Sequence, residues 1–156
     1  RAPYTNWIGQ LQAEDEKRVV TAMQLVGMSG YAEKTMDKMS DGECQRIMIA
    51  RALAQDTPII LLDEPTAFLD LPNRYELCLL LKKLTQTEGK CILFSTHDLD
   101  IALSLCDTIM QIDNPQLYSL PTNEMITSGH IERLFQNEMV TFDAKTIKIR
   151  IKQIFS

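Results

Sequence analysis

Two acidic residues, Asp63 and Glu64, directly follow a short apolar run at residues 59–62 of this 156-residue chain. The run reads Ile-Ile-Leu-Leu, which is typical of a parallel strand that helices cover on both faces. In an open α/β sheet, ligands bind outside the carboxyl ends of the strands, so both carboxylates are expected at a ligand site. A carboxylate pair in that position suits phosphoryl transfer, in which positioning and charge neutralisation carry the catalysis.

Each of these acids has a catalytic interpretation and a simpler one. Asp63 would hold Mg²⁺, usually through a bound water, because a hard cation prefers carboxylate oxygen. Glu64 would orient the attacking water or accept its proton. In the simpler interpretation one acid caps a helix and the other is solvated, and the two residues alone do not decide between these alternatives.

A second apolar run at residues 91–94 ends in the same way, just before chemically useful side chains. Ser95, Thr96, His97 and Asp98 follow this run, and Asp98 is placed to cap the next helix. His97 therefore occupies a strand-to-helix turn at the sheet edge where the carboxylates are expected. A histidine at such a turn is commonly structural, but from this edge it would also be able to donate a hydrogen bond to a γ-phosphate.

Residues 40–43, Ser-Asp-Gly-Glu, have the S-x-x-E spacing of a capping box. The spacing predicts a helix that begins here and ends before Thr57-Pro58, where the proline favours an extended entry into the strand. As a capping box alone, the segment only starts a helix. As a ligand site, its free amides and the positive end of the helix dipole would bind a phosphate, and the spacing leaves both possibilities open.

The apolar pattern of the remaining chain places these motifs on an α/β framework. Strand, helix, strand and helix follow one another from residue 58 onward, which predicts a sheet with parallel pairs behind a mostly helical lobe. We therefore divide the chain into a helical part, 1–57, and a sheet-containing part, 58–156. Further helices are predicted at 14–26, 30–38 and 71–88, from 122 to a stop at Gly129, and at 131–135. Further strands are predicted at 108–112, 117–120 and within 140–151, whereas 1–13 is expected to form a loop or short helix on a surface.

Composition excludes several classes of protein. The net charge is −5, with 16 Lys and Arg against 21 Asp and Glu, so the chain offers no basic surface that would make nucleic acid its main partner. The sequence contains no apolar run long enough to span a membrane and no secretory signal, which favours a cytoplasmic chain. The four cysteines lie within apolar helix or strand patterns and are expected to be buried, reduced thiols.

Five segments together resemble the ATP-binding cassette (ABC) ATPases. Residues 39–53 resemble the signature segment, usually written LSGGQ, and residues 59–63 resemble the Walker B strand. Glu64 is similar to the catalytic glutamate, residues 67–70 to the D-loop and His97 to the switch histidine. Each motif is weak alone, but five in the family's order, over most of residues 1–112, are specific. The resemblance implies a partial P-loop NTPase (RecA-like) core with a parallel sheet, plus an α-helical ABC subdomain.

The resemblance also implies a mechanism that spacing does not provide. Two such subunits pair head to tail and enclose two ATP molecules, each with Mg²⁺ held through Asp63. Asp70 would couple the two sites across the dimer. Closure and reopening of this dimer would drive transmembrane permease subunits. These subunits would hold the ATPase on the inner face of the cell membrane. The residues implied to bind the opposite subunit's ATP are Ser40, Asp41, Gly42 and Glu43.

The first residues, Arg-Ala-Pro-Tyr-Thr, and the Ser-Asp-Gly-Glu form of the signature are similar to importers of ferric siderophores, haem and cobalamin. Such importers also work with a substrate-binding protein, and no nucleic acid is implied. The alternative is a non-transport ABC protein, acting in DNA repair or translation, or a degenerate domain that serves only as an interaction module. The acidic composition and the absence of a coiled-coil pattern favour transport.

Two departures from the family pattern matter. Asp41 stands where the signature usually has glycine and Glu43 where it has glutamine, which brings acidic groups near the expected phosphate. The phosphate loop, G-x-x-x-x-G-K-[ST], does not occur in these 156 residues, because Gly89-Lys90 lacks the earlier glycine and precedes Cys91. We therefore expect that the chain begins just after the Q-loop of a longer protein and does not hydrolyse ATP by itself.

Overall fold

The computed structural model describes residues 13–135 and 139–151 of the chain. The surface segment predicted at residues 1–13 therefore lies almost wholly outside the described residues. Residues 1–5, which carry part of the similarity to chelate importers, lie wholly outside them. The chain separates into two compact units, residues 1–97 and 98–156, which are described in turn. The sequence instead predicted a division between residues 57 and 58. That division concerns the family's subdomains and stays a prediction.

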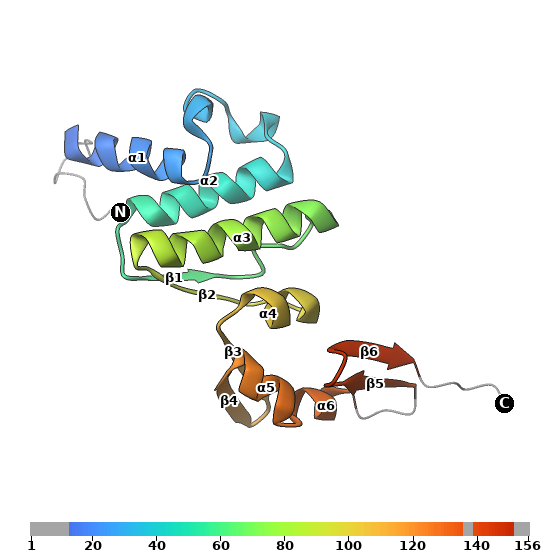
Figure 1. Ribbon diagram of the computed structural model, residues 1–156. Helices are drawn as coiled ribbons and strands as arrows, with labels where there is room; N and C mark the ends of the chain where they lie inside the picture. Colours follow the sequence, from blue (N-terminus) through green and yellow to red (C-terminus); the bar gives the residue numbers. More distant parts are fainter. Residues whose placement is uncertain (1–12, 136–138, 152–156) are drawn as a thin grey trace. The chain divides into compact units, whose positions relative to one another are not determined.

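From residue 13 onward, the first unit contains three α-helices and one parallel pair of strands (Figure 1). The helix after the capping box, both strands and the leucine-rich helix between them lie where the sequence predicted them. The single helix predicted at 30–38 was wrong: two short 3₁₀ helices form instead, because Thr35 between them is extended. The elements are α1 (Ala13–Leu25), η1 (Ser29–Tyr31), η2 (Met36–Lys38), α2 (Asp41–Ala54), β1 (Ile59–Leu62), α3 (Leu71–Glu88) and β2 (Cys91–Phe94).

The strands β1 and β2 pair in parallel, with Ile59 opposite Cys91 and Leu62 opposite Phe94. The prediction that both faces of these strands are buried was wrong. Ile60 is buried, but Leu61 is 70% exposed. Alternate residues of a strand point to opposite faces, and the described helices cover only one of them.

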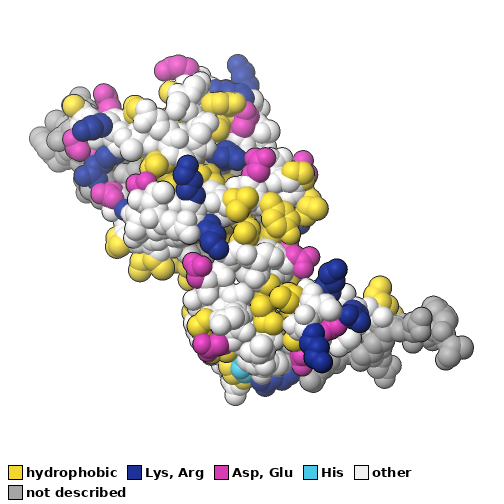
Figure 2. Space-filling view, viewed as in Figure 1, with side chains coloured by type: hydrophobic (Ala, Val, Ile, Leu, Met, Phe, Trp, Pro, Cys, Tyr) yellow, Lys and Arg dark blue, Asp and Glu magenta, His cyan; other side chains and the backbone are white. Residues whose placement is uncertain are grey.

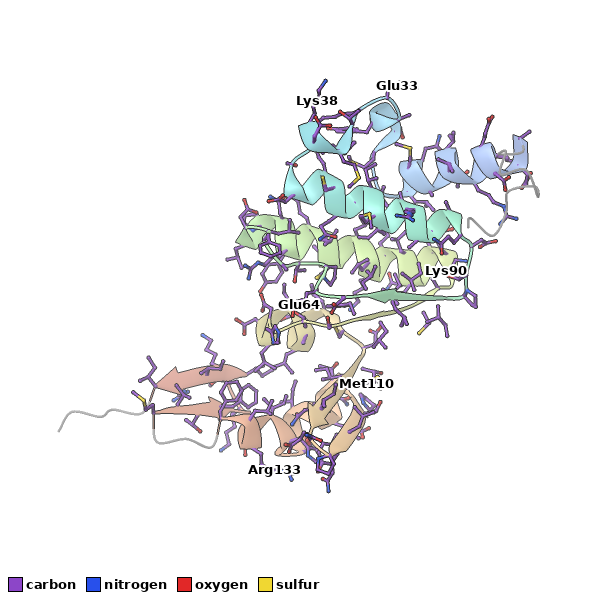
Figure 3. All side chains as sticks on the ribbon, turned by 180° about the vertical axis from the view of Figure 1, so that it is seen from behind. Glu33, Lys38, Glu64, Lys90, Met110 and Arg133 are labelled. Atoms are coloured by element: carbon purple, nitrogen blue, oxygen red, sulfur yellow. The ribbon has the colours of Figure 1, made fainter. Side chains whose placement is uncertain are left out.

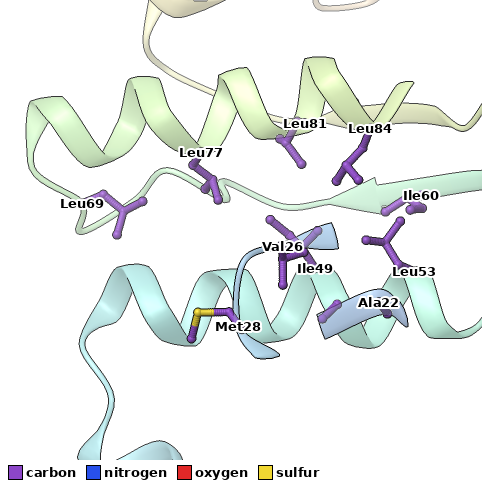
Figure 4. Close-up of a cluster of buried hydrophobic side chains, with 11 residues drawn as sticks. Ala22, Val26, Met28, Ile49, Leu53, Ile60, Leu69, Leu77, Leu81 and Leu84 are labelled. Atoms are coloured by element: carbon purple, nitrogen blue, oxygen red, sulfur yellow. The ribbon is translucent and has the colours of Figure 1, made fainter. Parts of the chain in front are cut away.

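The helices of the first unit pack their apolar sides together and onto β1. Figure 1 shows them stacked in the order α1, α2, α3, with the strand pair beside α3. The leucine stripe of α3 recurs at helical spacing and is buried against α2 and β1, as Figure 4 shows. The buried cluster consists of Ala22, Val26, Met28, Ile49, Ala50, Leu53, Ile60, Leu69, Leu77, Leu81 and Leu84.

An ion-pair cluster ties together the starts of the two strands. Lys90 Nζ lies 2.6 Å from Asp56 Oδ1, and Arg18 of α1 lies 3.3 Å from Asp56 Oδ2. The Lys90 hydrogen bond and charge lower the pKa of the Asp56 carboxyl. Figure 3 places Lys90 and Glu64 at opposite ends of the strand pair. The lysine of the Gly89-Lys90 pair therefore has a structural partner, far from the carboxylates.

In the part that the structure describes, the second unit has two antiparallel hairpins and three short helices. Its own core consists of Leu103, Met125, Ile131 and Phe142. The strands expected within 140–151 pair with each other. Its elements are α4 (Leu99–Leu105), β3 (Thr108–Asp113), β4 (Gln116–Pro121), α5 (Thr122–Thr127), α6 (His130–Leu134), β5 (Val140–Asp143) and β6 (Lys148–Ile151).

Two further expectations can be compared with the described residues. Across 13–135 and 139–151, none of the helices has the length and apolar character needed to cross a membrane. None of the four cysteines lies in a disulfide, but the prediction that all are buried was wrong. Cys78 is buried in α3, whereas Cys91 lies on the open face of β2 and is exposed.

Replacing Leu77 by alanine is expected to destabilise the protein by about 2–5 kcal/mol, because it leaves a cavity in the buried cluster. The matched control is Leu79→Ala on the same helix, where the side chain is 53% exposed and the cost should stay within about 0.5 kcal/mol. Chemical denaturation followed by circular dichroism measures both. Equal losses for the two variants would contradict the assignment of the buried face of α3.

Candidate functional site

The parallel pair brings Asp63 and Glu64 next to Ser95, the first residue after β2. Ser95 N–H donates to the Leu62 carbonyl at 3.1 Å, which extends the strand pairing by one residue. The Ser95 hydroxyl donates to Asp63 Oδ1 at 2.7 Å and accepts from the Glu64 backbone N–H at 2.8 Å. One hydroxyl thus bonds to both residues of the acidic pair.

Glu64 and His97 also meet at this edge. Glu64 Oε1 lies 2.8 Å from His97 Nε2, and the side chains are 46% and 89% exposed. Residues more than 30 positions apart in sequence are therefore joined by a polar contact that solvent and ligands can reach. Glu64 has a backbone φ of +40°, in the left-handed region that glutamate seldom adopts. The structure brings together Asp63, Glu64 and His97, as the sheet-edge argument predicted.

The segment between Glu64 and α3 is a tight turn that ends in a helix cap. Ala67 N–H donates to the Glu64 carbonyl at 2.9 Å, and Phe68, with φ +66°, leaves its side chain 90% exposed. Asp70 Oδ1 accepts from Asn73 N–H at 3.0 Å and so caps α3. Figure 2 shows exposed apolar side chains on the surface of this unit, and Phe68 and Leu71 are among the exposed residues.

The capping box at the start of α2 forms as the spacing predicted. Glu43 N–H donates to Ser40 Oγ at 3.3 Å, and Ser40 N–H donates to Glu43 Oε2 at 2.8 Å. Asp41 and Gly42 supply the first turn of the helix. A Cβ built on Gly42 would lie 3.9 Å from Asn73 and 4.0 Å from Leu69, in ordinary contact. The start of α2 therefore adjoins the start of α3.

Glu43 is held in a charged cluster with residues of the preceding segment. Lys34 Nζ lies 3.0 Å from Glu43 Oε2 and 4.6 Å from the centre of the Tyr31 ring. The hydrogen bond from Tyr31, followed by those from Ser40 N–H and Lys34, lowers the pKa of Glu43 to about 2. The same carboxylate raises the pKa of Tyr31. The acidic residue of this segment is thus ionised at neutral pH and paired with a lysine.

Sequence reasoning missed three residues of these clusters. Ser95 could have been found from the strand register, because the residue after Phe94 must face the residue after Leu62 in a parallel pair. Tyr31 and Lys34 had no such signal. They reach Glu43 only because the two 3₁₀ turns fold back toward α2.

The carboxylates at the end of β1 fit a cation that takes most of its ligands from water and substrate and few from the protein. Within the described ranges, no cluster of three or more His, Cys, Asp or Glu side chains is placed to hold a metal ion. Asp63 and Glu64 offer carboxylate oxygens only. Mg²⁺ is commonly bound by one or two carboxylates together with water and substrate phosphates, so the pair fits this ion and not a closed protein cage.

The comparisons with known proteins agree on one family. The sequence profile of the family described as "ABC transporter" matches residues 3–67. An uncharacterized ABC transporter ATP-binding protein of Methanocaldococcus jannaschii is 42% identical over 140 residues, covering 90% of this chain and 46% of that protein. The petrobactin import ATP-binding protein FpuD of Bacillus anthracis is 39% identical, covering 85% and 49%.

Another relative is the iron(3+)-hydroxamate import ATP-binding protein FhuC of Bacillus subtilis, 36% identical with coverage of 95% and 56%. Among solved structures, a dimeric ATP-binding cassette in a post-hydrolysis state, bound to ADP and Pi, matches with a TM-score of 0.59 and 30% identity. That match covers 74% of this chain and 51% of the other. The chain spans about half the length of the curated relatives it matches.

The Glu43 cluster predicts a specific pH response. Because the folded pKa lies below the ordinary 4.5, ionised Glu43 contributes stability above about pH 4.5 that is lost as pH falls toward 2. An NMR titration of the Glu43 carboxyl should show a midpoint near 2, and Tyr31→Phe or Lys34→Met should each move it upward. Lys38→Met, which removes one positive charge from the same segment, is the control. A midpoint of 4 or above in the unsubstituted protein would contradict the cluster.

Proposed function

Because this chain belongs to the ABC transporter family of ATP-binding proteins, we propose that the full-length protein is the ATP-hydrolysing subunit of an ABC importer. The observation that carries this proposal is the meeting of Asp63, Glu64 and His97 at the carboxyl end of the parallel strand pair. Ligands bind at this edge in α/β folds, and the three side chains suit phosphoryl transfer.

Each residue of the site then has a defined task. Asp63 would hold Mg²⁺, which neutralises phosphate charge when bound. Glu64 would orient the attacking water and accept its proton. His97 lies within hydrogen-bond distance of Glu64 and is largely exposed, so it would be able to contact both that carboxylate and the γ-phosphate of ATP.

The start of α2 would bind the ATP of a second subunit through Ser40, Asp41, Gly42 and Glu43. A helix N-terminus attracts phosphate through its free N–H groups and its dipole. The two acidic residues of this segment oppose that attraction, but Lys34 lies against Glu43 and offsets its charge. The cluster therefore supports a phosphate site in spite of the acidic signature.

A second copy of the subunit is the proposed partner at this surface. The similar cassette of known structure is dimeric, and Phe68 in the D-loop turn exposes an aromatic ring that the described residues of this chain leave uncovered. Asp70 would couple the two ATP sites in addition to capping α3. The Asp70 cap fixes the direction in which the chain passes from this turn into α3.

The proposed cargo is a ferric siderophore, with haem and cobalamin as the other chelates of this class. Relatives that cover 85–95% of the chain are import proteins for petrobactin and for iron(3+)-hydroxamate. The ATPase would dock on transmembrane permease subunits at the inner face of the membrane, and a substrate-binding protein would deliver the chelate to the permease.

Hydrolysis is proposed for the full-length protein, since these 156 residues contain no phosphate loop. The direct test compares Mg-ATP hydrolysis by this chain with hydrolysis by the same protein extended upstream through such a loop. Activity in the extended protein alone supports the proposal. Activity in neither would favour a degenerate interaction module, and activity in both would mean that these residues hold a complete nucleotide site.

In the full-length protein, Glu64→Gln should keep ATP binding and lose most turnover, by about 100-fold or more, because the amide cannot accept the proton of the attacking water. Steady-state phosphate release and equilibrium binding of labelled ATP measure the two properties. Glu88→Gln, at the exposed end of α3, is the control for loss of one carboxylate. Turnover within about threefold of the parent would remove Glu64 from this role.

The location of the signature site across the dimer can be tested with heterodimers. Placing Glu64→Gln in one subunit and Ser40→Ala in the other should leave one intact site, because both substitutions then fall on the same ATP. Placing both in one subunit should damage both sites. Turnover per dimer measured for the two arrangements should therefore differ severalfold, in favour of the first. The opposite order would mean that Ser40 serves its own subunit's ATP.

A further inference from the structure

Ser95 contributes three hydrogen bonds to the edge that carries the acidic pair. Its backbone N–H continues the ladder to Leu62, at 3.1 Å. Its hydroxyl donates to Asp63 Oδ1 at 2.7 Å and accepts from Glu64 N–H at 2.8 Å. Only the backbone bond belongs to strand pairing, so any residue except proline would keep it at this position. The two hydroxyl bonds are specific to serine or threonine.

The hydroxyl bonds fix the two features of the acidic pair that matter for chemistry. A carboxylate rotates about its last bond unless one oxygen is held, and Ser95 holds one oxygen of Asp63 while leaving Oδ2 for other ligands. Glu64 has a left-handed backbone at φ +40°, which costs energy unless neighbours determine it. The bond from Glu64 N–H to Ser95 Oγ fixes the peptide plane just before this strained residue.

We propose that Ser95 is a positioning residue, which aims the Asp63 carboxylate at Mg²⁺ and holds Glu64 in reach of the attacking water. The inference rests on the proposed ATPase function and adds a residue to its site. Groups that orient a metal ligand or a catalytic base through one hydrogen bond commonly change metal affinity or activity by about 10–100-fold when removed. Ser95 bonds to both members of the pair at once.

The test uses the full-length protein with Ser95→Ala and Ser95→Thr. The alanine variant should lose about tenfold or more in kcat, with the affinity for ATP measured without a divalent metal within about twofold of the parent, because Ser95 orients groups and does not bind nucleotide. Mn²⁺ used in place of Mg²⁺ should bind about tenfold more weakly in the presence of ATP, as measured by electron paramagnetic resonance. Ser95→Thr, which keeps the hydroxyl, should recover most of both losses.

Two further variants make the result decisive. Ser104→Ala removes an exposed hydroxyl from α4 and should change neither kcat nor Mn²⁺ affinity. Ser95→Cys keeps the size of the side chain but offers only a weak donor, so it must show the same losses even if the alanine variant unfolds more easily.

The outcomes separate this inference from the proposed function. An active parent whose Ser95→Ala and Ser95→Cys variants keep kcat and Mn²⁺ affinity would overturn the role of Ser95 and leave the ATPase intact. A threonine variant as impaired as alanine would also overturn it, because the hydroxyl would then be irrelevant. A parent that neither binds nor hydrolyses ATP would overturn the proposed function and the inference together.

Discussion

The parallel register between β1 and β2 is the constraint on which the candidate site depends. Pairing of Leu62 with Phe94, continued by the bond from Ser95 N–H to the Leu62 carbonyl, places Asp63 across from Ser95. Glu64, one residue past Asp63, and His97, two residues past Ser95, then reach each other. A shift of one residue would turn every side chain of the strand to the other face, so this register determines which groups meet at the edge.

Two strands of four residues cannot hold such a register alone, and the rest of the first unit supplies the support. A two-stranded sheet is marginal in water unless other elements pack against it. Here Ile60 is buried against the leucines of α3 and the apolar side of α2. At the opposite end of the pair, Asp56 binds Lys90 and Arg18, so the starts of both strands are fixed to each other and to α1. The site is thus fixed from one face and from the far end of the sheet.

The sequence predicted the α-helices and strands of the first unit and the meeting of three site residues because local patterns determine both, whereas the helix predicted at 30–38 was wrong. Apolar runs mark the strands, leucine spacing marks α3, and the sheet-edge rule brings Asp63, Glu64 and His97 together. To predict that Ser95 belongs to the site, the register between the two strands is needed as well, and no single segment encodes that register. The positions of Tyr31 and Lys34 depend on a helix break at the extended residue Thr35, which the helical pattern concealed. The exposed face of β1 depends on which neighbours are present.

The acidic form of the signature also depends on contacts with neighbouring residues. A glutamate at Glu43 accepts from Ser40 N–H as a glutamine would, but its charge strengthens that bond and the start of α2. The cost is a negative charge where a phosphate is proposed to bind. Lys34 and Tyr31 act on that charge directly, because one pairs with the carboxylate and the other donates a hydrogen bond to it. The acid therefore brings a firmer helix cap, and the lysine beside it offsets the charge of that acid.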